Sequence, residues 1–336
     1  TNLTDAYLSV KFPVKVEDDN LLVNPAVCPD TSLAGAVGKL TVGQALRQGD
    51  LTIAMRLGAK SFKLFEDVEE YEAAFYELEK QAGLDAVTYE GSLNVVEHLW
   101  DIFLLNGAQI SQDFELITHG RQSQKIHDPH TIVYGNRQDI FVEEGADIKA
   151  SVLNAQSGPI YIGKNAVVHE NAVLLGPLAL MENSHINIGS KIREATTIGP
   201  HSKMGGEVKN VVVFGNSNKG HEGFLGNSVV GEWCNFGADT NNSNLKNNYQ
   251  AVKLWNYGKG NFENTGELFC GLMMGDHSKC GINTMFNTGS VVGVSANIFG
   301  TGYQDKFVPS FSWGGVSSTR IYRIDKALEV ASSVMG

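Results

Sequence analysis

Residues 162–204 read IGKNAVVHENAVLLGPLALMENSHINIGSKIREATTIGPHSKM, and every sixth residue of this stretch is aliphatic or methionine. The series consists of Ile162, Val168, Leu174, Leu180, Ile186, Ile192, Ile198 and Met204. The fourth position after most of these residues is small: Ala166, Ala172, Ser184, Ser190, Thr196 and Ser202. A strand repeats about every two residues and an α-helix about every 3.6, so neither gives this period. The pattern is the hexapeptide repeat of a parallel β-helix, and we predict that its large residues point inward and its small residues fill the corners.

The same period returns closer to the C-terminus, in Leu268, Met274, Cys280, Phe286, Val292 and Ile298. Three repeats of six make one three-sided coil, so a β-helix from near Ile140 to near Ile298 would hold roughly seven to nine coils. The period fails at Asn210, where an inward residue is due, and resumes at Phe224, Val230 and Phe236. It fails again over 238–266, a span rich in Asn. We expect excursions from the coil at both places, and such loops are where function concentrates.

The first 125 residues predict a mixed α/β domain. The segment LTIAMRL (51–57) alternates like a strand, and VEEYEAAFYELEKQAG (68–83) predicts an amphipathic helix that ends at Gly83. A second helix is expected over 92–114 as a linker between domains, with Asn106-Gly107 ending or interrupting it. The first residue is Thr, and we expect that an N-terminal segment of the natural protein precedes it.

The remaining boundaries follow from the repeat. We expect the β-helix domain over 138–300 and a C-terminal arm over 301–336, which ends in a helix that caps or crosses the coils. The predicted fold is therefore an α/β N-terminal domain, a parallel β-helix and a C-terminal helix.

Composition narrows the classes of function. The chain has 336 residues, 42% of them hydrophobic, and a formal net charge of −11, which argues against nucleic-acid binding. No apolar run approaches the roughly 18 residues of a membrane span, and no signal peptide is visible, so we expect a cytoplasmic protein. The four cysteines lack metal-ligand spacing. His127 and His130 are expected to be an exposed pair in a connector, so no metal site is predicted.

Four short motifs lie in and around the breaks. They are Glu207-Val208-Lys209, the run HEGFLG that begins at His221, Asn235-Phe236-Gly237-Ala238, and Asn244. With these motifs, residues 140–300 resemble the acyltransferase half of the bifunctional N-acetylglucosamine-1-phosphate uridylyltransferase/glucosamine-1-phosphate acetyltransferase family. The resemblance implies a left-handed β-helix that forms a homotrimer with sites shared between subunits, acetyl-CoA as donor, and a sugar phosphate or nucleotide sugar as partner. Residues 1–125 look like the remainder of a sugar nucleotidyltransferase domain, but the Gly-rich phosphate loop of that family is absent from this chain.

The resemblance also implies roles for individual residues. It gives a catalytic role to His221, as general base, and to Asn235. It assigns substrate binding to Lys191, Lys209, Phe224, Asn244 and Lys253, and CoA binding to Ala238, Gly271 and Leu272. Three positions depart from the family: Lys191 replaces an Arg, Phe224 replaces a Tyr, and Asp239 replaces a Gly. These changes leave the acceptor sugar open.

The chemistry of these residue types fits such roles. An imidazole titrates near neutral pH and suits a base that takes the proton of an attacking amine. Lys191 and Lys209 are 18 residues apart, one full coil, so without an insertion they would stack roughly 5 Å apart, the spacing of adjacent strands. Like charges so placed favour a bound phosphate. Asn235 and Asn244 offer amide donors and acceptors for sugar hydroxyls, or an Asn ladder at the corners.

Three functions stay open on the sequence. The first is acetyl transfer to an amino sugar phosphate or sugar nucleotide. The second is sugar-1-phosphate nucleotidyl transfer, which requires Mg²⁺ if that domain is active, with the β-helix serving to trimerise the protein. The third is a scaffold or sugar-nucleotide-binding protein without catalysis. A β-helical metalloenzyme is disfavoured because His169, His185 and His201 are 16 residues apart rather than 18.

Overall fold

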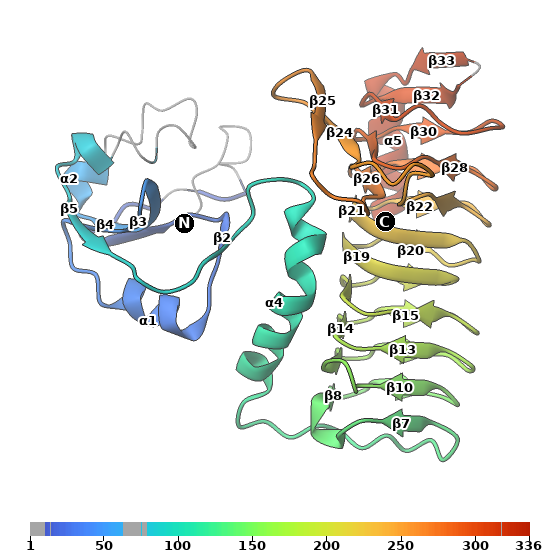
Figure 1. Cartoon of the computed structure of the whole chain (residues 1–336), viewed down its shortest axis with the longest axis horizontal. Coiled ribbons are helices and arrows are strands. Elements are labelled where there is room, and N and C mark those ends of the chain that lie inside the picture. The colour runs from blue at the N-terminus through green and yellow to red at the C-terminus, as the bar shows by residue number, and fades with distance from the viewer. Residues whose placement is uncertain (1–10, 14, 63–74, 76–78, 317) are drawn as a thin grey trace. The chain divides into compact units, whose positions relative to one another are not determined.

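A computed structural model describes residues 11–13, 15–62, 75, 79–316 and 318–336. The chain forms two compact units, Thr1–Glu97 and His98–Gly336, and each is described by itself (Figure 1). The units therefore divide near residue 97, whereas the sequence placed the boundary at 125. The difference arises because the predicted linker helix packs on the β-helix and belongs to the second unit.

The first unit is a small α/β structure, as the sequence predicts. A four-stranded sheet has the order β1-β4-β3-β5, with β1 (Asn20–Val23), β4 (Leu51–Leu57), β3 (Gln44–Gln48) and β5 (Asp85–Thr88). The predicted strand 51–57 coincides with β4, whose residues enter two apolar clusters: Met55 and Leu57 share one with Leu22, while Ile53 and Ala54 share the other with Leu33. The other elements are β2 (Val27–Cys28), paired with β6 (Asn94–Val95), and the helices α1 (Thr31–Gly38) and α2 (Ala59–Phe62).

The helix predicted over 68–83 lies mostly outside the described residues. Within the described part, Glu79–Gln81 are helical and Gly83 follows with a φ of +62°. This positive φ fits the predicted helix end at Gly83.

The second unit is a left-handed parallel β-helix of about ten coils, more than the seven to nine predicted, because it begins at Ile132 and continues to Gly315. Its strands form three walls, stacked from β7 to β33 in Figure 1. We number the walls in the order in which the chain first visits them.

Wall 1 contains β7 (Ile132–Tyr134), β10 (Val152–Asn154), β13 (Val173–Leu175), β16 (Lys191–Ile192), the first halves of β19 (Glu207–Gly215) and β21 (Phe224–Glu232), β23 (Asn241–Asn242) and β28 (Met285–Phe286). Wall 2 contains β8 (Ile140–Val142), β11 (Ile160–Ile162), β14 (Leu178–Leu180), β17 (Thr196–Ile198), the second halves of β19 and β21, β26 (Leu272–Met274), β29 (Ser290–Val292) and β31 (Phe307–Val308). Wall 3 contains β9 (Asp147–Ile148), β12 (Val167–Val168), β15 (His185–Ile186), β18 (Lys203–Met204), β20 (Asn218–Lys219), β22 (Asn235–Phe236), β27 (Lys279–Cys280), β30 (Asn297–Ile298), β32 (Ser312–Gly315) and β33 (Ser318–Ile321).

The predicted inward residues form the core of this prism. All eight residues of the series from Ile162 to Met204 have 0% exposure. Two predicted inward residues are wrong. Leu268 is 45% exposed, because the chain is still outside the coil there. Phe224 faces outward, and Leu225 occupies the core in its place, because the coils near it are shorter than 18 residues.

One coil lacks three residues, two of them at a corner between walls 3 and 1 and one between Val208 and Val213, the partners of Ile192 and Ile198. Ile186 pairs with Met204, 18 positions later, but Met204 pairs with Lys219, only 15 positions later. Four residues (187–190) form this corner in one coil, whereas only Gly205 and Gly206 form it in the next. The break that the sequence placed at Asn210 therefore begins at this Gly-Gly pair, which we call the truncated corner.

Helix α4 (Asp101–Thr118) packs on wall 2, against β14, β17, β19 and β21. It begins at 101 rather than 92, because Asn94–Val95 form β6. It also continues through Asn106-Gly107, where the sequence predicted an interruption. Asn106 donates to the Ala195 oxygen at 2.7 Å and accepts from Thr197 at 2.8 Å, and an added Cβ at Gly107 would lie 3.1 Å from Cβ of Ala195. The pair is therefore the point of close helix–sheet contact.

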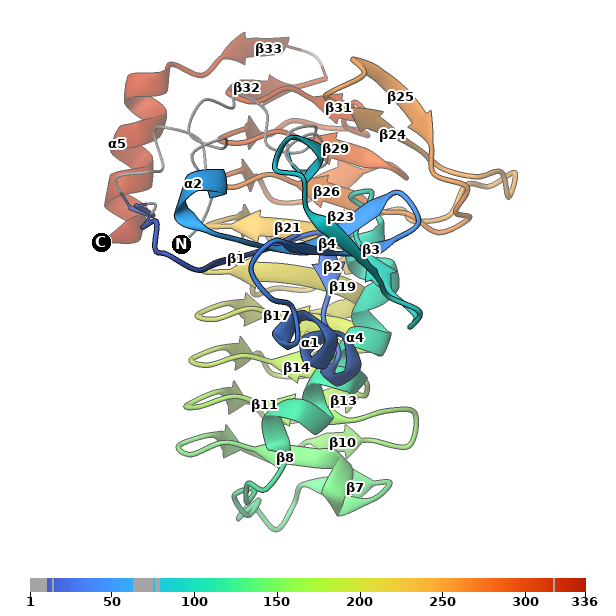
Figure 2. The same cartoon turned by 90° about the vertical axis from the view of Figure 1, so that its left-hand side faces the viewer.

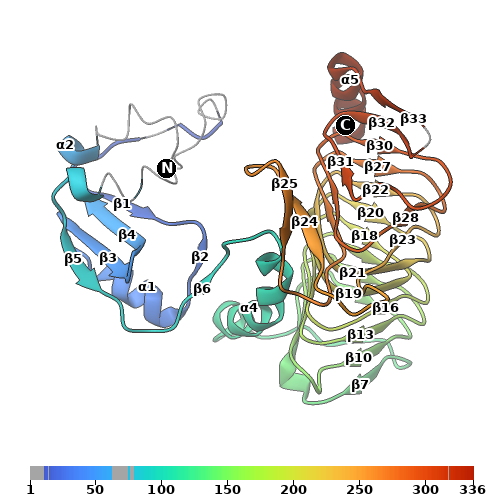
Figure 3. The same ribbon diagram turned by 45° about the horizontal axis from the view of Figure 1, so that its top comes forward.

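The Asn-rich excursion spans 243–271 rather than 238–266, since β23 still belongs to the coil and its Asn242 is buried. It carries the hairpin of β24 (Lys253–Asn256) and β25 (Asn261–Asn264), which projects from the stack in Figure 3. The C-terminal helix α5 (Ile324–Met335) runs alongside the coils (Figure 2). The short 3-10 helix Arg137–Asp139 precedes β8. No helix within the described ranges is long and apolar enough to cross a membrane.

Candidate functional site

His221 lies on an exposed bend, residues 220–223, that connects wall 3 to wall 1. The next coil packs closely against the bend. Gly223 has a φ of +122°, and an added Cβ there would lie 2.1 Å from the Thr240 oxygen. A side chain at this position would clash with the next coil, so glycine is required. The imidazole of His221 is outside the prism core, where a base must be to meet a substrate.

The truncated corner brings this bend close to an earlier coil. Asn187 donates from its side-chain amide to the Gly220 oxygen at 2.7 Å, although the two residues are 33 positions apart. The Nζ atom of Lys191 lies 3.6 Å from Oε2 of Glu222 across the same gap. The shorter corner therefore lets residues 187–191 contact the His221 bend past Gly205 and Gly206, and we call the place where these three segments meet the notch.

The outer face of wall 1 beside the notch carries a network of alternating charges. Lys209 contacts Glu194 at 3.0 Å, and Arg193 contacts Glu194 at 3.6 Å and Glu207 at 3.3 Å. Burial acts to raise the pKa of Glu194, but hydrogen bonds from its own backbone and from Lys209, with the nearby charges of Lys209 and Arg193, leave this pKa below its ordinary value. Together with Lys191 and Glu222, the three cations face three carboxylates.

The two lysines do not stack as the 18-residue spacing predicts. Lys191 pairs in register with Glu207, and Lys209 pairs with Gly226, because the coil between them is shortened. The expected clamp of two adjacent ammonium groups is therefore absent, and each lysine has a carboxylate partner. An anionic ligand would have to compete with these carboxylates.

The structure brings Phe224 and Asn244 together on wall 1. An added Cβ at Gly226 would lie 2.4 Å from Cζ of Phe224 and 3.0 Å from Nδ2 of Asn244, so the ring and the amide flank this glycine. Asn244 also donates to Oδ1 of Asn227 at 2.8 Å. The Phe224 ring is thereby fixed over the backbone, in register with Glu207.

Asn235 lies on the outer face of wall 3. It accepts a hydrogen bond of 3.1 Å from Asn218, its neighbour in register on β20. An added Cβ at Gly220 would lie 2.9 Å from Oδ1 of Asn218, so Asn218 links Asn235 to the His221 bend. The sequence analysis did not single out Asn218 or Asn187.

Three other predicted residues lie apart from the notch or within the core. Lys253 begins β24, whose neighbouring residues Val252 and Leu254 pack against wall 2. Leu272 has 0% exposure, so its side chain cannot contact a ligand, and Gly271 is equally enclosed by Gly226, Asn242 and Ser228. Ala238 is the exception, since it lies at the corner next to the bend, where Asp239 donates to the Glu222 oxygen at 3.0 Å.

Lys219 is a residue of this region that sequence reasoning missed. It takes an inward position, in register with Met204, and is 1% exposed. Its Nζ donates to the oxygens of Gly205, His221 and Gly223. The sequence does mark this inward position. Ser217 lies two positions before Lys219, as a small residue lies two positions before each inward residue from Ile186 to Met204.

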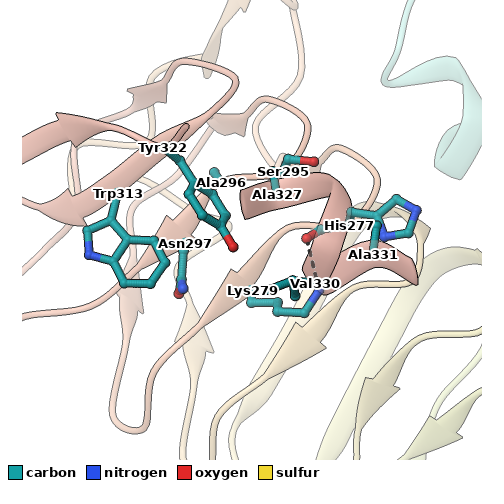
Figure 4. A pocket seen from close by; sticks show the side chains of 10 residues that line it. All are labelled: His277, Lys279, Ser295, Ala296, Asn297, Trp313, Tyr322, Ala327, Val330 and Ala331. Carbon is teal, nitrogen blue, oxygen red and sulfur yellow. Dashed lines mark hydrogen bonds between the residues drawn. The ribbon is translucent and has the colours of Figure 1, made fainter. Parts of the chain in front are cut away.

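A small cavity of about 100 Å³ lies between α5 and wall 3 (Figure 4). Lys279, Asn297 and Tyr322 supply its polar lining, and Trp313 and Val330 its apolar lining. Lys279 donates to the His277 oxygen at 3.1 Å, and burial lowers the pKa of its ammonium. Lys279 also pairs in register with Asn235, so the cavity opens on the same wall as the site.

Metal ligands are not gathered in the described ranges. No group of three or more His, Cys, Asp or Glu side chains there could hold an ion. His127 and His130 are both exposed in the connector. The described residues thus provide no set of carboxylates for Mg²⁺.

The first part of the chain matches a known family. Residues 1–122 match the model of the family described as sugar nucleotidyl transferase. This match covers the first unit and α4, and it agrees with the α/β fold observed there.

Curated relatives match part of this chain. The bifunctional protein GlmU of Methanocaldococcus jannaschii is 31% identical over 153 residues, covering 46% of this chain and 33% of the relative. The bifunctional sugar-1-phosphate nucleotidylyltransferase/acetyltransferase of Sulfurisphaera tokodaii is 31% identical over 152 residues, covering 39% and 37%. The chain thus spans less than half the length of these relatives. Among solved structures, the polySia-specific acetyltransferase NeuO is 14% identical with a TM-score of 0.31, covering 62% of this chain and 98% of that one.

The matching family and the curated relatives are both transferases by description. This chain is therefore similar to sugar nucleotidyl transferases over residues 1–122 and to part of bifunctional GlmU-like proteins.

Proposed function

We propose that the notch around His221 is an acyl-transfer site, where an acetyl group passes from acetyl-CoA to the amine of a sugar phosphate or nucleotide sugar. The observation that carries the proposal is an exposed imidazole on a bend tied to three coils, beside a face with three cations and three carboxylates. Asn187 and Asp239 donate to oxygens of the bend at 2.7 and 3.0 Å, and Oδ1 of Asn241 accepts at 2.7 Å from Phe224, the residue that follows the bend. A rigid bend suits a group that must meet its substrate in one geometry.

In the proposed reaction His221 acts as general base. The amine nitrogen attacks the thioester carbonyl, a C–N bond forms, and His221 takes the proton that the nitrogen loses. The tetrahedral intermediate then collapses, the C–S bond breaks, and the imidazolium returns its proton to the departing thiolate of CoA. The products are the N-acetyl sugar and free CoA. A general base contributes typically about 10²–10⁴-fold to the rate of such a step.

The mixed charge of wall 1 fits an acceptor that carries both signs. An amino sugar phosphate has an ammonium group, which Glu207 or Glu222 can attract before deprotonation, and a phosphate, which Lys191 or Lys209 can attract. Asn244 and the face of Phe224 lie beside these charges and suit a sugar ring with hydroxyl groups. Since Phe224 lacks a hydroxyl, phosphate binding rests on the lysines.

We propose that the site is completed by a neighbouring copy in a homotrimer of the cytoplasm. Supporting this, the corner that carries His221 has exposed aliphatic residues in other coils: Ile188 is 67% exposed and Ile282 is 70% exposed. Apolar residues aligned along one edge are typical of surfaces that pack against another chain. In such an assembly, CoA would contact Ala238 and the partner copy, since Gly271 and Leu272 are enclosed.

The test is an acetyl-transfer assay in which the release of CoA thiol is followed with acetyl-CoA and a panel of amino sugar phosphates and amino nucleotide sugars. Thiol release that depends on the acceptor, with the N-acetyl product identified by mass spectrometry, supports the proposal. If no member of the panel is acetylated while the protein is trimeric, the acyl-transfer proposal is wrong.

A second function is favoured by the family match over residues 1–122. In this alternative the first unit transfers a nucleotidyl group to a sugar-1-phosphate and the β-helix serves for assembly. Incubation with nucleoside triphosphates, Mg²⁺ and sugar-1-phosphates tests it. Release of pyrophosphate supports the alternative, and its absence with all nucleotides contradicts it.

A further inference from the structure

The stack of inward apolar side chains contains one cation beside the His221 bend. Lys219 lies in register between Met204 and the coil of Phe236, and its side chain is 1% exposed. A buried charge costs several kcal/mol unless polar partners compensate it. All three of its hydrogen-bond acceptors are main-chain oxygens.

Three oxygens surround the ammonium group. Nζ lies 3.3 Å from the oxygen of Gly205, 3.0 Å from that of His221 and 2.9 Å from that of Gly223. A lysine ammonium has three protons, so each oxygen can accept one. One acceptor is in the truncated corner and two are in the bend, which means that a single side chain holds both sides of the notch.

We propose that Lys219 is a positioning residue that fixes the backbone of His221 from inside the prism. Within the described part of the chain, the His221 oxygen accepts from Lys219 and from no other donor. The neighbouring oxygens of Glu222 and Gly223 also accept from Asp239 and Glu207, at 3.0 and 3.3 Å. The hydrogen bond from Lys219 therefore holds the main chain at His221 itself.

Lys219 takes no direct part in the proposed acyl transfer, because its side chain is buried. Burial lowers the pKa of Lys219 to about 8, while the charges of Glu222, Cys280 and Asp239 act to raise it. The ammonium form therefore predominates at neutral pH, with all three protons donated. Because the group is enclosed, it does not reach a substrate at the notch, and it acts through the bend alone.

The catalytic consequence of this role rests on the proposed acyl transfer, but the positioning can be measured without substrate. Lys219→Met keeps the length and apolar stem of the side chain and removes the donors. Lys164→Met, at an exposed corner residue, is the matched control. Hydrogen exchange is measured at the amides of Glu207 and Asp239, which donate to the bend, together with the rate at which diethyl pyrocarbonate modifies His221.

In Lys219→Met we expect exchange at these two amides to be at least ~10-fold faster and the modification rate of His221 to change, with the control unchanged. Each tenfold increase in exchange rate corresponds to a decrease of about 1.4 kcal/mol in the free energy of local opening. If the bend exchanges as slowly in Lys219→Met as in the wild type and His221 reacts at the same rate, the proposal is wrong.

A second variant covers the case in which Lys219→Met does not fold. Lys219→Ala removes three carbons and the ammonium, which is the size of n-propylammonium. Added n-propylammonium should restore slow exchange in the bend, whereas n-propanol, which lacks the charge, and tetramethylammonium, which lacks donors, should not. Equal recovery with n-propanol would contradict the proposal, since packing alone would then explain the effect.

Activity separates the two proposals. If acetyl transfer is found, Lys219→Met should lower kcat at least ~10-fold with little change in KM, and n-propylammonium should raise the kcat of Lys219→Ala. If exchange and modification respond as expected but the wild type acetylates nothing, the acyl-transfer proposal fails while the positioning role stands.

Discussion

The side-chain amide of Asn187 donates a 2.7 Å hydrogen bond to the main-chain oxygen of Gly220, two coils further along the β-helix. In a regular solenoid each coil contacts only its neighbours. This bond is possible because the coil between has only Gly205 and Gly206 at its corner. The shortened corner, rather than a long inserted loop, creates the notch in which His221 lies.

Filling the truncated corner should displace the bend. In Gly205→Ala the new Cβ would lie 2.4 Å from the Gly220 oxygen, so backbone must move, at a cost of typically about 1–3 kcal/mol. Gly281 occupies the same corner position in a later coil, and its added Cβ would meet Phe299 at an ordinary 3.5 Å. We expect Gly205→Ala to lower the midpoint of thermal unfolding and acetyl transfer, and Gly281→Ala to change neither. Equal behaviour of the two variants would contradict the role of the corner.

The ion pair across the notch should affect binding more than stability. Lys191 and Glu222 are 51% and 68% exposed, and such pairs contribute about 0–1 kcal/mol. We expect Lys191→Met to raise KM for anionic acceptors several-fold. Glu222→Gln should lower it, because Lys191 then has no competing carboxylate. Steady-state kinetics at low and high salt measures both, and a change of the same sign in the two variants would rule out this competition.

Lys219 should give the unfolding free energy a defined pH dependence. Its pKa is lowered from 10.5 to about 8 in the folded chain, so between these values the unfolded chain holds a proton that the folded chain has released. The free energy of unfolding therefore rises with pH across this window, by about 3 kcal/mol relative to a variant without the amine. The penalty of the buried charge is fully present below about pH 8.

The measurement for this prediction is denaturant unfolding of the wild type and Lys219→Met from pH 7 to 11. The difference between their free energies should favour the wild type progressively as pH rises. A difference that is flat over the window would show that the lysine titrates normally.

The contact between α4 and wall 2 should be a main source of stability for the second unit. Phe103 is 0% exposed and packs with Trp100, Val229 and Val252. Phe103→Ala should destabilise this unit by about 3–5 kcal/mol, the usual cost of removing a buried phenyl ring. Leu104→Ala, at a residue that is 41% exposed on the same helix, is the control and should change the unfolding free energy by less than half as much.

The sequence predicted the prism well where every side has six residues. The series from Ile162 to Met204 is inward throughout, since a strict period follows directly from equal coils. Counting failed where corners change length: Phe224 was assigned inward in place of Leu225, and the stacking of Lys191 on Lys209 was not found. A repeat period does not show where a coil lacks residues, because only the pairing of its strands with the next coil locates the missing positions.

The candidate site was predicted only in part for the same reason. Lys191 meets the His221 bend through Glu222 and Phe224 follows the bend, whereas Lys209 and Asn244 lie at the other end of wall 1 and Leu272 lies in the core. Lys219 was missed because a lysine contradicts the rule that inward residues are apolar. Its three acceptors are main-chain oxygens, which no side-chain pattern can reveal.

The acetylation rate of His221→Ala tests the central claim most directly. It should be measured with acetyl-CoA and the best acceptor of the panel, beside His201→Ala, an exposed corner histidine outside the notch. We expect His221→Ala to lose at least ~100-fold in kcat, as befits removal of a general base, and His201→Ala to match the wild type. Wild-type turnover in His221→Ala would contradict the account, because the notch would then not supply the base.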